Sequence, residues 1–104
     1  MPHSVAVVTT PSPERYAKQL LSHLGHKATV EAVPGVADAS RLYLSAGVGT
    51  VRIEGNTSLV LEADAADAEA LDRVQDVLRR HLVRFGRRDE LQVEWSLVPD
   101  AADG

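Results

Sequence analysis

Side chains that could hold an anion or move a proton near neutral pH gather in two short basic stretches. These stretches are RYAKQLLSHLGHK (15–27) and VLRRHLVRFGRR (77–88). Histidine titrates near neutral pH, and arginine and lysine donate charged hydrogen bonds to carboxylates and phosphates. We therefore expect an anionic ligand or partner to bind here. The candidate ligand-binding residues are His23, His26, Lys27, His81, Arg84 and Arg88.

A purely structural explanation of the same residues stays open. A basic last turn followed by glycine stabilises a helix end without any ligand, and the helix dipole at that end repels anions. His81 lies beside the apolar stripe of its helix, so we expect it to be half-buried and hydrogen-bonded to the backbone. Capping does not require histidine, however, because lysine or arginine would serve equally well. The choice of histidine is therefore the functional hint.

The residues of these two stretches give less support to metal binding or to catalysis. His23 and His26 are three positions apart with Gly25 between them, so they do not share a helical face as an i,i+4 metal pair does. Ser22 beside His23 is adjacency in sequence only, and no Ser-His-Asp or paired-carboxylate spacing is present. We therefore expect no metal site and no catalytic residue, and the residues name no cofactor. An enzyme with a histidine acid–base is the least supported hypothesis.

The amino-acid composition limits the classes of molecule that the protein is expected to bind. The chain has 104 residues and no cysteine, which excludes disulfides and thiolate ligands. A net charge of −4 with only four aromatic residues is unlike a nucleic-acid-binding surface, so no nucleic-acid partner is expected. No leader pattern and no apolar run long enough to cross a bilayer occur. We therefore expect a cytoplasmic protein without a membrane partner.

Two helices are predicted to carry the candidate residues. The first runs from 13 to 24, with Ser12 as its N-cap and Gly25 as a left-handed residue after its end. The second begins around 64–67 and ends at Phe85, because its apolar residues recur every three or four positions. Both patterns indicate amphipathic helices that pack one face on a sheet.

Six segments alternate in the manner of β-strands or form short apolar runs. They cover 5–8, 28–33, 41–45, 51–54, 58–63 and 91–97, with His3 in a frayed start and a glycine turn at 47–49. The order β-α-β-β-β-β-α-β predicts an α+β fold with a single, mostly antiparallel twisted sheet and both helices on one face. A ferredoxin-like or TATA-binding-protein-like arrangement fits this order. We expect residues 1–98 to form one domain and 99–104 a flexible tail.

The open face of this sheet is the alternative functional surface. It should display charges of both signs and one tyrosine, which suits cross-strand pairing or contact with a partner. Tyr43, Arg41 and Arg52 are the candidate interface residues of a structural homodimer module. In a pseudo-symmetric pair of β-α-β units, the two helices should run antiparallel. Their histidine clusters would then lie at opposite ends of the sheet, where a homodimer could reunite them.

The two motifs RYAKQLLSHLGHK and RHLVRFGRRDELQVEW together resemble a small bacterial family, domain of unknown function 2218. The resemblance extends over about residues 4–96. One helix of that family ends in His-x-x-His-Lys, and a second carries His-Leu-x-x-Phe. The family pattern falls here on Arg15, Tyr16, Gln19, Leu20, His23, His26, Lys27, His81, Leu82, Phe85, Arg88, Glu90 and Trp95.

The resemblance implies a context more than an activity. Members of the family are often encoded beside, or joined to, siderophore-interacting ferric reductases, which implies iron acquisition and a reductase as a partner. Many members have cysteine where this chain has Leu21, so a thiol-dependent activity is excluded here. Our leading hypothesis is a small binding or accessory module linked to siderophore-iron utilisation, in which the histidine and arginine clusters contact an anionic ligand or partner.

Overall fold

The computed structural model describes residues 2–26, 28–36, 38–87 and 91–98. Its elements follow the predicted order of strands and helices. They are β1 (His3–Thr9), α1 (Pro13–Leu24), β2 (Thr29–Ala32), β3 (Ala39–Tyr43), β4 (Gly47–Glu54), β5 (Ser58–Ala65), α2 (Ala68–Phe85) and β6 (Ser96–Val98). No helix of the described residues is both long and apolar enough to cross a membrane.

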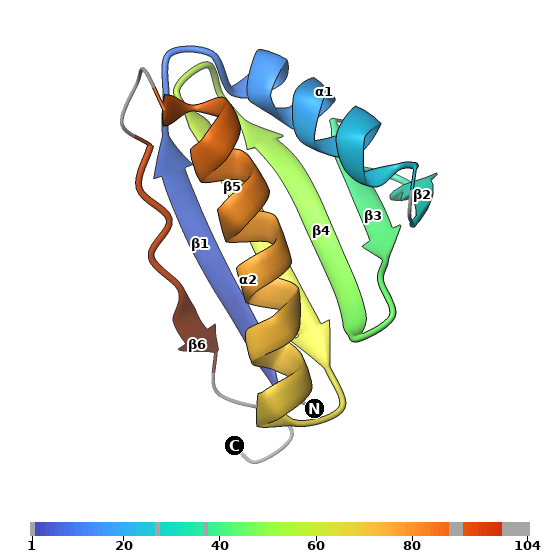
Figure 1. The fold of residues 1–104 in the computed structure, drawn as a ribbon. Coiled ribbons are helices and arrows are strands. Elements are labelled where there is room, and N and C mark those ends of the chain that lie inside the picture. The colour runs from blue at the N-terminus through green and yellow to red at the C-terminus, as the bar shows by residue number, and fades with distance from the viewer. Residues whose placement is uncertain (1, 27, 37, 88–90, 99–104) are drawn as a thin grey trace.

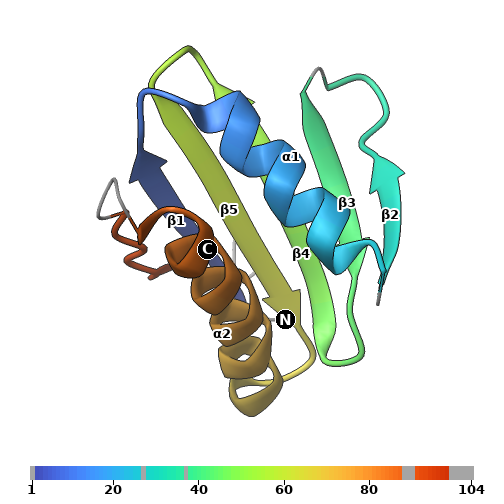
Figure 2. The ribbon, with the colours of Figure 1, turned by 45° about the horizontal axis from the view of Figure 1, so that its top comes forward.

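The six strands form one open sheet in the order β2-β3-β4-β5-β1-β6, and every neighbouring pair is antiparallel. Both helices cover the same face of this sheet, and α1 runs obliquely to α2 (Figures 1 and 2). The predicted α+β class, the antiparallel sheet and the one-sided helices are therefore confirmed. Among the described residues, no helix covers the opposite face of the sheet (Figure 2).

The core lies between the two helices and the sheet. Leu20 and Leu24 of α1 and Leu78 and Leu82 of α2 are almost completely buried, as the predicted apolar stripes require. They pack against alternate residues of the central strands, such as Leu61 of β5. This packing holds the C-terminal halves of both helices in place on the sheet.

Gly47 and Gly49 belong to β4, not to the turn predicted at 47–49. Residues 45 and 46 form the turn instead. The N–H of Leu44 closes it by donating a hydrogen bond to the carbonyl oxygen of Gly47 (2.8 Å). A Cβ atom on Gly49 would lie 3.1 Å from Cδ1 of Leu78. These glycines therefore let α2 approach the strand closely, which is a packing role that the alternation pattern does not reveal.

The helix ends differ in detail from the prediction. Ser12 occupies the N-cap position of α1 but its side chain makes no capping hydrogen bond. Gly25 has a φ of −61° and Gly86 a φ of −96°, so neither is left-handed. A Cβ on Gly86 would collide with the side chain of Leu91. Gly86 is thus explained by the close passage of the returning chain, and the similar endings of the helices have different physical causes.

Both ends of the sheet also differ from the prediction. All four residues of β2 are exposed, since β2 lies at the edge and beyond the cover of α1. Only Ser96–Val98 pairs as β6, although Leu91, Val93 and Trp95 do face the core as the alternation predicted. His3 is not frayed, because β1 begins there and pairs with β5. The predicted tail at 99–104 lies outside the described residues.

Candidate functional site

The two predicted histidine clusters meet within one chain. The ring centroids of His23 on α1 and His81 on α2 lie 4.9 Å apart, and those of His23 and Phe85 lie 5.5 Å apart in a T-shaped arrangement. The expectation that the clusters occupy opposite ends of the sheet was wrong. The two helices lie at an oblique angle on one face of the sheet (Figure 1), and the ring contacts place His23, near the end of α1, against His81 and Phe85 in the last turns of α2.

His81 is anchored through one of its two ring nitrogens. Its Nδ1 lies 2.7 Å from the carbonyl oxygen of Val77, one turn back, and the side chain is half-buried. A carbonyl oxygen can only accept, so Nδ1 carries the proton and donates. In the neutral ring, Nε2 is then the acceptor nitrogen. The predicted backbone-bonded histidine is confirmed, and the bond also sets the orientation of the ring.

A shallow pocket of about 380 Å³ borders this contact. His23, His26 and Phe85 line it together with Lys18, Gln19 and Ser22. None of these lining side chains carries a carboxylate, so the pocket presents hydrogen-bond donors and an aromatic edge. Gln19 and Lys18 were not among the candidate residues. The four-residue spacing of Arg15, Gln19 and His23 along α1 was the signal that could have pointed to Gln19.

Of the three remaining candidate residues, Arg84 is the one within the described part of the chain. Arg84 is exposed in the last turn of α2 and does not line this pocket. Lys27 and Arg88 fall outside the described residues. Among the described residues, no group of three or more His, Asp or Glu side chains is arranged to hold a metal ion.

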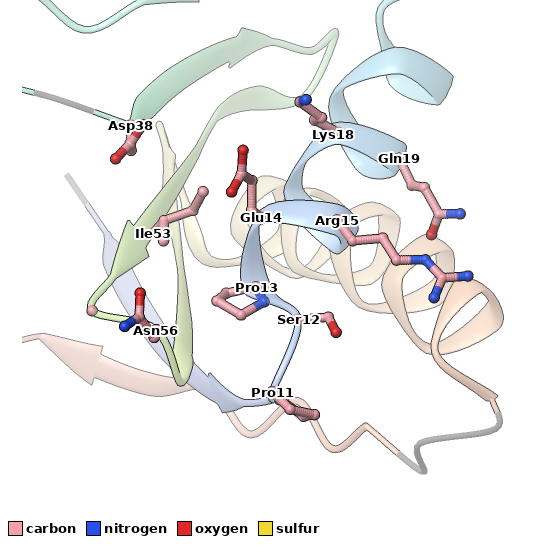
Figure 3. Close-up of a pocket in the computed structure, with 11 residues that line it drawn as sticks. Pro11, Ser12, Pro13, Glu14, Arg15, Lys18, Gln19, Asp38, Ile53 and Asn56 are labelled. Carbon is pink, nitrogen blue, oxygen red and sulfur yellow. The ribbon is translucent and has the colours of Figure 1, made fainter.

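A second, larger cavity of about 810 Å³ lies at the start of α1 and shares Lys18 and Gln19 with the first. Glu14 and Lys18 project toward the side where Asp38 and Ile53 lie, whereas Gln19 projects the other way (Figure 3). This cavity therefore has carboxylates in its wall, unlike the histidine pocket. Because Arg15 and Lys18 lie in the same wall, charges of both signs line this cavity.

The predicted interface residues share the open sheet face. In the strand register, Arg41 lies opposite Thr50, Tyr43 opposite Val48, and Arg52 opposite Val60. This confirms that the alternation assigned these side chains to the correct face. Their role as a homodimer interface stays a prediction.

Sequence reasoning missed the ion-pair network on that face. Nδ1 of His3 lies 2.6 Å from Oδ1 of Asp64, and Nε2 lies 3.3 Å from Oε1 of Glu62. Nε of Arg52 lies 4.0 Å from Oε2 of Glu62. Glu62 and Asp64 lie two positions apart on one strand, which is a detectable signal, but nothing local to His3 indicates these partners, of which Asp64 is 61 residues away.

Comparison with known proteins supports the family and the fold. An NMR structure of PA4090 from Pseudomonas aeruginosa matches with a TM-score of 0.73 and 25% sequence identity, over 92% of this chain and 96% of that protein. No curated protein matches. The model of domain of unknown function 2218, described as an uncharacterized protein conserved in bacteria, matches residues 5–96. The chain therefore belongs to the domain of unknown function 2218 family.

Proposed function

We propose that this protein is a small binding module that holds an anionic ligand at the junction of α1 and α2. The observation that carries the proposal is the meeting of His23 with His81 and Phe85 beside a pocket lined by donors. Imidazole and ammonium groups stabilise a carboxylate or phenolate, and Phe85 offers an apolar edge to its organic part.

The family resemblance suggests which anion to test first. Its iron-acquisition context favours an anionic iron(III) chelate, presented to or received from a siderophore-interacting reductase. The pocket is shallow, about 380 Å³, so it would contact one side of a chelate and leave the other side accessible to a partner protein. The protein then acts as an accessory to the iron chemistry, without a catalytic residue of its own.

The test is an NMR titration of the isotope-labelled protein with gallium(III) citrate, a diamagnetic substitute for the iron(III) chelate, and with citrate and phosphate alone. Saturable shifts are expected in the amides of 18–26 and 81–86 and in the ring protons of His23 and His81. The double variant His23→Gln/His26→Gln should bind at least tenfold more weakly while keeping its dispersed spectrum.

The matched control is His3→Gln, which removes a histidine from the opposite sheet face. It should leave the affinity for each probe unchanged. The proposal is refuted if no probe gives saturable shifts at the junction, or if the double variant binds as tightly as the parent protein. Shifts produced by citrate and gallium citrate alike would identify the carboxylate, not the chelate, as the recognised group.

A further inference from the structure

The open sheet face contains a hollow that is separate from the histidine junction. Its volume is about 480 Å³, within the range of about 300–1,000 Å³ typical of small-molecule sites. Val33, Val36 and Val48 contribute apolar surface to its lining. Val60, which points to the same face in the strand register, is only 1% exposed. This face is therefore not uniformly charged but includes an apolar patch.

The carboxylates of this hollow already have partners. Asp64 lies 2.6 Å from one ring nitrogen of His3, and Glu62 lies 3.3 Å from the other. Arg52 is 3.2 Å from Glu54 and 4.0 Å from Glu62. Glu54, Glu62 and Asp64 thus share one permanent cation, Arg52, and His3 adds a positive charge to this network only when it is protonated.

Arg41 is the charged lining residue that this network does not include. Within the described part of the chain, no carboxylate oxygen lies within 4 Å of its guanidinium. Its pKa is raised, first by a hydrogen bond with the Tyr43 side chain and further by the more distant carboxylates of Glu31 and Asp64. Arg41 is accordingly a permanent cation that lines the hollow, and its planar donors suit a carboxylate.

We propose that this hollow binds a small monocarboxylate with an aliphatic body. The carboxylate is bound by the Arg41 guanidinium, and the hydrocarbon chain packs on the apolar surface of Val36 and Val48. A second acidic group on the ligand would meet Glu62 and Asp64, which disfavours dicarboxylates. This site lies on the sheet face opposite the α1–α2 junction, so its existence does not depend on the function proposed above.

The experiment is an amide NMR titration with hexanoate, compared with 1-hexanol and hexylamine at equal concentrations. Hexanoate is expected to give saturable shifts in residues 36, 39–43 and 48–50 and none at His23 or His81. Hexanol should bind at least tenfold more weakly, since it has the same chain without the charge. Hexylamine should also bind more weakly than hexanoate, and tighter binding of its cation, through Glu62 and Asp64, would overturn the proposal.

Two variants test whether the guanidinium of Arg41 is the group that binds the carboxylate of hexanoate. Arg41→Gln should weaken hexanoate binding at least tenfold, whereas Arg73→Gln, which removes an exposed arginine on α2, should leave it unchanged. Equal affinity for hexanol and hexanoate would overturn the proposal, and this comparison needs no substitution. So would unchanged binding in Arg41→Gln, or shifts at these residues that follow protein concentration and report a dimer instead.

Discussion

The contact between Gly49 and Leu78 offers a direct test of how α2 is held against the sheet. An added methyl group at position 49 would lie 3.1 Å from Cδ1 and 3.3 Å from Cδ2 of Leu78. Attractive carbon–carbon contacts occur at about 3.5–4.0 Å, so the helix or the leucine must retreat by several tenths of an ångström. Leu78 is 0% exposed, so any movement must displace other residues of a packed core.

Gly49→Ala should therefore destabilise the protein by about 1–3 kcal/mol, the usual cost of inserting a methyl group into a packed core. For a domain of this size, each kcal/mol lowers Tm by about 4–8 °C. Urea unfolding followed by circular dichroism measures the loss directly. Because His81 lies one turn after Leu78 on α2, the ring proton signals of His81 and His23 should also shift in this variant.

A double-mutant cycle separates this steric explanation from a general effect of alanine in a strand. Leu78→Val alone should destabilise, because it removes a buried methylene of about 0.8 kcal/mol and leaves a cavity. In Gly49→Ala/Leu78→Val the new methyl group partly fills that cavity, so the double variant should be more stable than additivity predicts by about 0.5–3 kcal/mol. Additive losses, or a Gly49→Ala protein as stable as the parent, would refute the reasoning.

Two further predictions concern buried polar groups. The Ser4 hydroxyl is 0% exposed and accepts a 2.6 Å hydrogen bond from Nε2 of Gln75, so Ser4→Ala should cost about 1–3 kcal/mol in urea unfolding by leaving the amide unpaired. Ser4→Ala/Gln75→Leu should recover much of that loss, and a larger loss in the double variant would contradict the explanation. The indole N–H of Trp95 is buried without a hydrogen-bond partner among the described residues. Trp95→Phe should therefore change the midpoint of thermal unfolding little or raise it, and a loss above about 1 kcal/mol would show that the ring's size matters more than its unpaired donor.

Local patterns predicted the elements because each pattern is set by geometry over a few residues. The three-and-four spacing of apolar residues indicated where α2 ends, and that end is Phe85 as predicted. Strict alternation assigned Arg41 and Arg52 to the open face, since side chains on a strand point to opposite sides in turn. It also identified Leu91 and Trp95 as inward-facing residues, although the segment around them forms no ladder.

Such local patterns could not predict which strand lies at the edge of the sheet or where two elements approach each other closely. The alternation of β2 is the same as that of a half-buried strand, yet β2 is exposed because α1 does not extend over that edge of the sheet. The sequence alone does not show whether a glycine is needed for a turn or for a close contact between two elements. Only the position of Leu78 above Gly49, and of Leu91 beside Gly86, tells the two apart.

The sequence by itself determined the family, the α+β class, the order of the elements and the face on which residues such as Arg41 and Arg52 lie, because these depend on short-range periodicity and on motif residues within single helices. The tertiary structure alone decided that His23 meets His81 and that His3 meets Asp64 and Glu62. Both contacts depend on how twisted layers pack, since the crossing angle of helices and the pairing of distant strands arise from the fit of whole surfaces. The sequence thus indicated His23, His81 and Arg41 individually, but which residues surround them in space is a property of the fold.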